Sequence, residues 1–115
     1  MQMTGFPSPA QGYEQNTFDF NSLLITHPAA TFAMRYEGEA LESEHIVRGD
    51  MLIVDCSLHP LPGKIAVVVD ESDFRCVRLL KDESDAKEFC YVDDSGNVRR
   101  MVRLFGIVSA VVRML

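Results

Sequence analysis

A serine and a histidine stand two positions apart in Glu42-Ser43-Glu44-His45, and these are residue types that nucleophilic catalysis uses. A serine hydroxyl attacks a carbonyl once a nearby base accepts its proton. Neighbours in sequence do not generally converge in space, however, and the two glutamates predict a loop that faces water. We therefore interpret Ser43 as a surface residue, and a catalytic role for it remains an alternative.

Three aspartates and one further histidine could also do chemistry. Asp50, Asp55 and Asp70 have the carboxylates that a metal ion would need, and His27 could act as a base. Each aspartate lies at the end of an expected strand, where Asp is a common turn residue, and His27 has no nucleophile to pair with. We interpret all four as structural and expect no metal or other cofactor.

The three cysteines, Cys56, Cys76 and Cys90, show no CxxC spacing. An odd number without that spacing supports neither a metal site nor a disulfide framework. Reduced thiols are typical of the cytoplasm, and nothing at the N-terminus resembles a signal peptide. We therefore expect a cytoplasmic protein.

The stretch from Gly38 to Asp55 must position most of these residues, because it lies between and within expected strands. Thr31–Glu37 leads into it, and Met51–Asp55 is an apolar strand ending at an acidic residue. Arg48-Gly49-Asp50 predicts a tight turn in which the glycine adopts a positive φ. The segment Glu39–Val47 is then an excursion held by rigid strands, where functional sites are often placed.

The rest of the chain predicts a mainly β fold with one short helix near the N-terminus. Asp19 or Asn21 can cap that helix, and Pro28 stops it. Alternating residues and turn residues predict two hairpins and a last apolar strand: Ile65–Asp70 with Phe74–Leu80, Phe89–Val92 with Val98–Arg103, and Leu104–Met114, which closes the sheet. Gly106 indicates a bulge or a bend in this last strand.

Length and charge limit the function. A chain of 115 residues is one domain that can bury its own core, and 47% hydrophobic with 24% charged residues is an ordinary globular balance. The formal net charge of −6 disfavours direct, specific DNA binding, which depends on lysine and arginine. The apolar C-terminal run is too short to span a bilayer, so we expect no membrane contact.

The order of strand, Gly38-Glu39-Ala40-Leu41, loop, Gly49-Asp50 and apolar strand resembles the catalytic box of the LexA/UmuD serine peptidases, whose tetrad reads Gly-Asp-Ser-Met. The likeness extends from Gly5 to Val112 and includes Leu23-Leu24-Ile25-Thr26-His27-Pro28 and Leu104-Phe105-Gly106-Ile107-Val108. It implies that family's C-terminal-domain fold, in which curled, mostly antiparallel sheets are accompanied by one short N-terminal helix.

In that family a serine attacks a backbone carbonyl, and a lysine on a later strand takes its proton. Ala40 holds the serine position here, and Val77 holds the lysine position in Cys76-Val77-Arg78-Leu79. A shift of one residue would bring Arg78 there, and arginine is not deprotonated in proteins. Ala40 alone would be consistent with an engineered inactivation, but engineering gives no reason for the valine at position 77. The resemblance therefore implies a degenerate peptidase without catalytic residues, and not an enzyme.

Residues 1–16 are rich in glycine and proline and predict an extended arm, whereas residues 17–115 predict a single β domain. Gly5-Phe6-Pro7-Ser8-Pro9-Ala10 resembles the start of mature UmuD′, the fragment left after UmuD cuts itself. Only Met1–Thr4 precede this match, so almost nothing remains to be removed. On composition alone the arm would be disordered, and the resemblance favours an ordered, partner-contacting arm.

What the resemblance implies about function is a non-catalytic UmuD′-like subunit. Such a subunit forms a homodimer, binds a UmuC-type translesion DNA polymerase and works with RecA filaments in SOS mutagenesis and DNA repair. One alternative is a pseudo-peptidase regulator that pairs with an active UmuD or LexA relative. Another is a residual serine self-cleaving peptidase that uses Ser43. We expect the last strand, Phe105–Val112, to contribute much of the dimer contact, unless the arm folds back over it.

Overall fold

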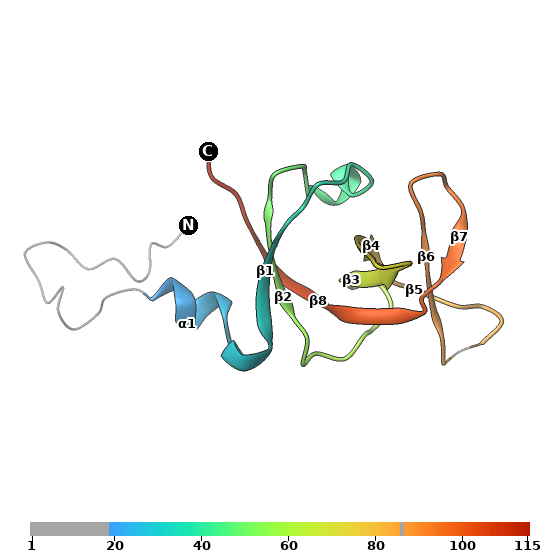
Figure 1. Ribbon diagram of the computed structural model, residues 1–115, viewed down its shortest axis with the longest axis horizontal. Coiled ribbons are helices and arrows are strands. Elements are labelled where there is room, and N and C mark those ends of the chain that lie inside the picture. The colour runs from blue at the N-terminus through green and yellow to red at the C-terminus, as the bar shows by residue number, and fades with distance from the viewer. Residues whose placement is uncertain (1–18, 86) are drawn as a thin grey trace, which may run out of the picture.

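The computed structural model describes residues 19–85 and 87–115, so the expected arm at residues 1–16 lies outside the described residues. The described chain is mainly β, with two antiparallel sheets, one short α-helix and two single 3-10 turns (Figure 1). This confirms the predicted fold class.

Five strands form the larger sheet, in the order β1-β2-β8-β3-β4. Their bounds are β1 (Thr31–Arg35), β2 (Met51–Asp55), β8 (Arg103–Val112), β3 (Ile65–Asp70) and β4 (Asp73–Arg78). Each neighbouring pair is antiparallel. The expectation that the last strand closes the sheet is wrong. β8 lies in the middle, where it pairs with β2 on one side and β3 on the other, and it joins the two halves of the molecule.

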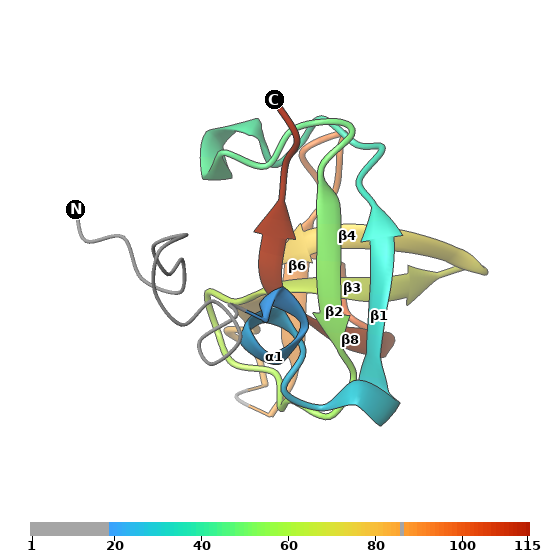
Figure 2. The ribbon, with the colours of Figure 1, turned by 90° about the vertical axis from the view of Figure 1, so that its left-hand side faces the viewer.

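The larger sheet curls where β8 passes between β2 and β3, so that β1 and β2 run across the direction of β3 and β4 (Figure 2). The register of β8 against β3 shifts between Val67 and Val68, at Gly106. A Cβ on Gly106 would lie 2.7 Å from Val54 Cγ1. The bulge predicted at Gly106 is therefore confirmed, and glycine is needed there because β2 approaches so closely.

A second, three-stranded sheet consists of β5 (Leu80–Lys81), β6 (Phe89–Val92) and β7 (Val98–Arg100). The buried Leu79 separates β4 from β5, so the single strand predicted over 74–80 is two strands in different sheets. Asp93 begins the turn between β6 and β7, where its carboxylate accepts hydrogen bonds from two turn amides. This confirms the second predicted hairpin.

The two faces of the larger sheet contribute to two apolar clusters. The first cluster packs the loop after β1 onto one face and comprises Tyr36, Leu41, Ile46, Leu52, Val54 and Val67. The second packs the small sheet onto the other face and comprises Ala66, Val68, Val77, Leu79, Tyr91 and Ile107. β3 contributes to both clusters, which explains why its sequence is apolar almost without interruption.

The short helix α1 (Phe20–Leu24) has Asp19 as its N-cap, and the Asp19 carboxylate accepts the N–H of Asn21 at 2.9 Å. After η1 (Pro28–Ala30) the chain enters β1. His27 Nδ1 lies 2.6 Å from Asp55 Oδ2, which ties this segment to the end of β2. None of the helices in residues 19–85 and 87–115 has the length and apolar character needed to cross a membrane.

Candidate functional site

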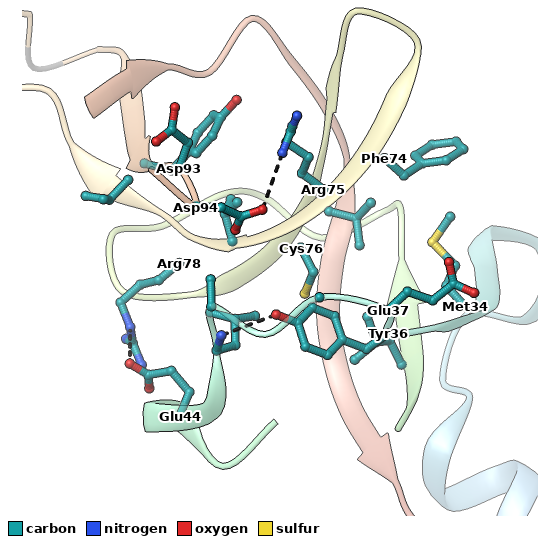
Figure 3. Close-up of a pocket in the computed structure, with 18 of the residues that line it drawn as sticks. Met34, Tyr36, Glu37, Glu44, Phe74, Arg75, Cys76, Arg78, Asp93 and Asp94 are labelled. Carbon is teal, nitrogen blue, oxygen red and sulfur yellow. Dashed lines mark hydrogen bonds and ion pairs between the residues drawn. The ribbon is translucent and has the colours of Figure 1, made fainter. Parts of the chain in front are cut away.

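A cleft of about 700 Å³ opens between the loop after β1 and the edge strand β4, with the small sheet contributing a further wall (Figure 3). Met34, Phe74 and Leu80 give it apolar surface. Charged side chains also line it, including Glu37 and Arg75. The cleft therefore offers both apolar contacts and hydrogen-bonding groups to an occupant.

Ala40 and Val77, the positions that the resemblance matches to the family's serine and lysine, both line this cleft although 37 positions separate them in the sequence. Ala40 is exposed and precedes the turn η2 (Glu42–Glu44). Val77 is 8% exposed and belongs to the second apolar cluster. Neither side chain has an atom that can attack a carbonyl or accept a proton.

Arg78, the alternative base position, is held by two neighbours. Its Nε donates to Glu44 at 3.0 Å, its Nη2 donates to the other oxygen of the same carboxylate, and its Nη1 donates to the Gly63 carbonyl at 2.6 Å. Arg78 therefore links β4 to η2 beside the cleft (Figure 3). An arginine in this position fastens two elements and cannot take up a proton.

Tyr36 lies beneath the loop that carries Ala40, with only 5% of its surface exposed. Its hydroxyl oxygen accepts a hydrogen bond from the backbone N–H of Leu41 at 3.2 Å (Figure 3). Burial raises the pKa of the Tyr36 hydroxyl, so it stays neutral near neutral pH. Sequence reasoning did not identify Tyr36 as a residue of the site. The only feature that could have pointed to it is its position two residues before Gly38, where the excursion begins.

Cys76 is the one thiol that lines the cleft among the described residues. Burial raises its pKa to about 12. Because the thiolate is the nucleophilic form, the Cys76 thiol does not act as a nucleophile at neutral pH.

Ser43 also lines the cleft, in the middle of η2. In the part of the chain that the structure describes, it shares no hydrogen bond with His45, and the His45 carbonyl instead accepts from Arg113 at 2.9 Å. His45 has a left-handed backbone with φ 64° and ends η2. The structure therefore does not join Ser43 and His45 into a nucleophile–base pair.

The three aspartates considered as metal ligands face different partners. Arg113 donates two hydrogen bonds of 2.7 Å to Asp50, Ser57 and His27 donate to Asp55, and Arg75 donates to Asp70 at 3.2 Å. No group of three metal-ligating side chains occurs within residues 19–85 and 87–115. The arrangement supports their structural interpretation.

Hydrogen bonds keep Asp50 and Asp55 ionised. The paired Arg113 guanidinium, followed by the Val47 N–H, lowers the pKa of Asp50 to about 2. The Ser57 hydroxyl, followed by His27, lowers the pKa of Asp55 to about 2. The two carboxylates sit at opposite ends of β2, where each fixes the chain that enters or leaves the strand.

The sequence matches the family described as Peptidase S24-like over residues 2–89. Protein ImpA of Salmonella typhimurium is 37% identical over 112 residues, which cover 94% of this chain and 76% of that protein. Protein MucA of Escherichia coli is 42% identical over 76 residues, or 66% of this chain and 52% of that protein. Protein SamA of Salmonella typhimurium is 36% identical over 75 residues, or 65% of this chain and 54% of that protein. The chain therefore belongs to the Peptidase S24-like family, which includes the LexA- and UmuD-type proteins that the sequence resembles.

Proposed function

We propose that this chain is a non-catalytic, UmuD′-like accessory subunit that works with a UmuC-type translesion DNA polymerase in SOS mutagenesis. The observation that carries the proposal is the cleft itself. It is lined by Ala40 and Val77, the positions that resemble the family's serine and lysine, and neither side chain can act as a nucleophile or a base. The similarity to ImpA, MucA and SamA supports the UmuD-type assignment.

The charge distribution supports action through protein partners rather than by direct grip on DNA. The net charge is −6, and most of the arginines already pair with carboxylates. These pairs involve Arg48, Arg75, Arg78, Arg99, Arg100 and Arg113. Binding to DNA phosphates depends on available lysine and arginine side chains. This surface therefore fits contacts with proteins better than direct contact with DNA, and the proposed assembly is a homodimer bound to a polymerase, with a RecA filament as a further partner.

The proposal is tested by co-expressing the chain with a UmuC-type polymerase and measuring primer extension past an abasic site. We expect the polymerase to co-purify with the chain and lesion bypass to increase when the chain is present. A polymerase that neither binds the chain nor responds to it contradicts the proposal. A polymerase mixed with its own active UmuD-type partner serves as the positive control.

A second candidate function is a regulator that pairs with an active UmuD or LexA relative. The observation that favours it is the open cleft beside β4, an edge strand to which an extended peptide can add by main-chain hydrogen bonds. Adding the chain to an active relative and following that relative's self-cleavage separates the two functions. A change in the cleavage rate without any effect on a polymerase favours the regulator.

A further inference from the structure

The backbone amide that follows Ala40 donates to a side-chain oxygen of this protein. The N–H of Leu41 meets the Tyr36 hydroxyl at 3.2 Å. The close-up shows the Tyr36 ring beneath this loop, with its hydroxyl directed at the main chain (Figure 3). The Leu41 amide, which follows the position that resembles the family's serine, therefore faces an oxygen of this protein.

Backbone contacts fix Tyr36 in this position. Its N–H donates to the Asp50 carbonyl at 2.8 Å, and its own carbonyl accepts from Gly49 at 2.8 Å. A Cβ on Gly38 would lie only 2.7 Å from the Tyr36 hydroxyl oxygen. The ring thus lies directly against Gly38, and the absence of a side chain there gives the hydroxyl room beneath the loop.

Peptide-bond cleavage needs donors of this kind. When a serine attacks a carbonyl, the developing oxyanion is stabilised by backbone N–H groups, commonly those next to the nucleophile. We propose that the Tyr36 hydroxyl fills the oxyanion hole of this cleft and makes the Leu41 amide unavailable to a peptide carbonyl. Tyr36 is then a block to catalysis that is separate from Ala40 and Val77.

This inference deepens the proposed non-catalytic function and rests on it. A peptide can lie along β4 while its carbonyl stays unpolarised, so the cleft binds an extended segment without activating it. The tests below use neither a polymerase nor a relative. The inference can therefore fail while the proposed function stands, and the proposed function can fail while the inference stands.

The first test measures the Leu41 amide directly. In Tyr36→Phe the ring keeps its packing, but this amide loses its acceptor. We expect the Leu41 amide, followed by NMR hydrogen exchange, to exchange roughly threefold to tenfold faster than in the wild type. Tyr91→Phe is the matched control, because Tyr91 is a buried tyrosine of the same cleft, and it should leave the Leu41 amide unchanged. Equal exchange in the wild type and Tyr36→Phe overturns the contact.

The second test measures the chemical consequence. The double variant A40S/V77K is compared with the triple variant A40S/V77K/Y36F for its rate of labelling by an alkyl fluorophosphonate. In this reaction the serine oxygen bonds to phosphorus, fluoride leaves, and the lysine takes the serine proton. We expect the triple variant to label on the order of 100-fold faster, because its Leu41 amide is free to stabilise the phosphoryl oxygen. Equal labelling, or no labelling of either variant, overturns the claim that this hydroxyl blocks the site. Intact mass reports the product, and A40S/V77K/Y91F is the control.

Discussion

Arg113 donates two hydrogen bonds of 2.7 Å to the carboxylate of Asp50, which is only 1% exposed. A third hydrogen bond from Arg113 reaches the His45 carbonyl at 2.9 Å. Asp50 and His45 belong to the loop that carries Ala40, whereas Arg113 follows the last strand. The C-terminal segment therefore holds the loop that carries Ala40, although 63 positions separate Arg113 from Asp50.

Removing Arg113 should destabilise the fold. Arg113→Met leaves the Asp50 carboxylate buried without its cation, and we expect the melting temperature to fall on the order of 10 °C. Arg48→Met is the matched control, because Arg48 pairs with Glu39 at an exposed site and should change the melting temperature by about 2 °C or less. Equal effects of the two substitutions in a thermal melt followed by circular dichroism would show that the Asp50 contact contributes little.

Stability should fall in acid because of Asp50 and Asp55. Their pKa values are lowered to about 2, below the unfolded value of about 3.9, so their contribution is complete above about pH 5 and is lost as the pH falls towards 2. The measurement is the urea midpoint between pH 2 and pH 5. The Asp50→Asn variant should be less stable near neutral pH and show a flatter decline in this window. An unchanged slope in that variant argues against the linkage.

Introducing a serine at Ala40 or a lysine at Val77 alone should produce no activity. Ala40→Ser supplies a hydroxyl whose proton has no acceptor, and Val77→Lys places a lysine in an apolar cluster with nothing to activate. Nucleophile and base act as a unit, so only the double variant, which brings both groups to the cleft, can be active. Tyr36 should keep the cleavage rate of this double variant low. Cleavage of a relative's arm, read by mass spectrometry, reports activity. Activity in Ala40→Ser alone would mean that another base serves the cleft.

We also predict a homodimer that uses a face of β8. Both edges of β8 are paired within the sheet, so the contact cannot form by strand addition to it. Val111 is 38% exposed and therefore available on that strand. Light scattering over a dilution series should show a dimer for the wild type and a monomer for Val111→Glu. Val102→Glu is the control, because Val102 lies outside the strand, and it should remain a dimer. A monomeric wild type, or a folded and dimeric Val111→Glu, would place the interface elsewhere or remove it.

Short apolar strands could be predicted from sequence, but the position of one of them in the sheet could not. Met51–Asp55, Ile65–Asp70 and Phe89–Val92 have the predicted bounds, because each is an apolar run ended by turn residues. The last strand is predicted only to close the sheet, and the structure places it in the middle of the sheet. Strand order depends on pairing between distant segments, which alternation along one strand does not encode.

The site could be predicted in part. Family resemblance identified Ala40 and Val77, and the structure brings both to one cleft. The contacts of Tyr36 and the link between Arg78 and Glu44 could not be predicted, because they depend on how the loop folds over β4. Local sequence shows which side chains can donate or accept, but not which partners a tertiary fold brings within hydrogen-bonding distance.

The most direct test of the account is the mass of the purified chain after incubation. Samples are held at alkaline pH, and separately with activated RecA filaments and nucleotide, and are then measured by intact-mass spectrometry beside an active LexA protein as the positive control. With Ala40 and Val77 lining the cleft and Tyr36 beneath it, we predict an unchanged mass under conditions in which the control is cut. A discrete fragment that disappears in Ser43→Ala would contradict the account and would show that the chain is a serine peptidase.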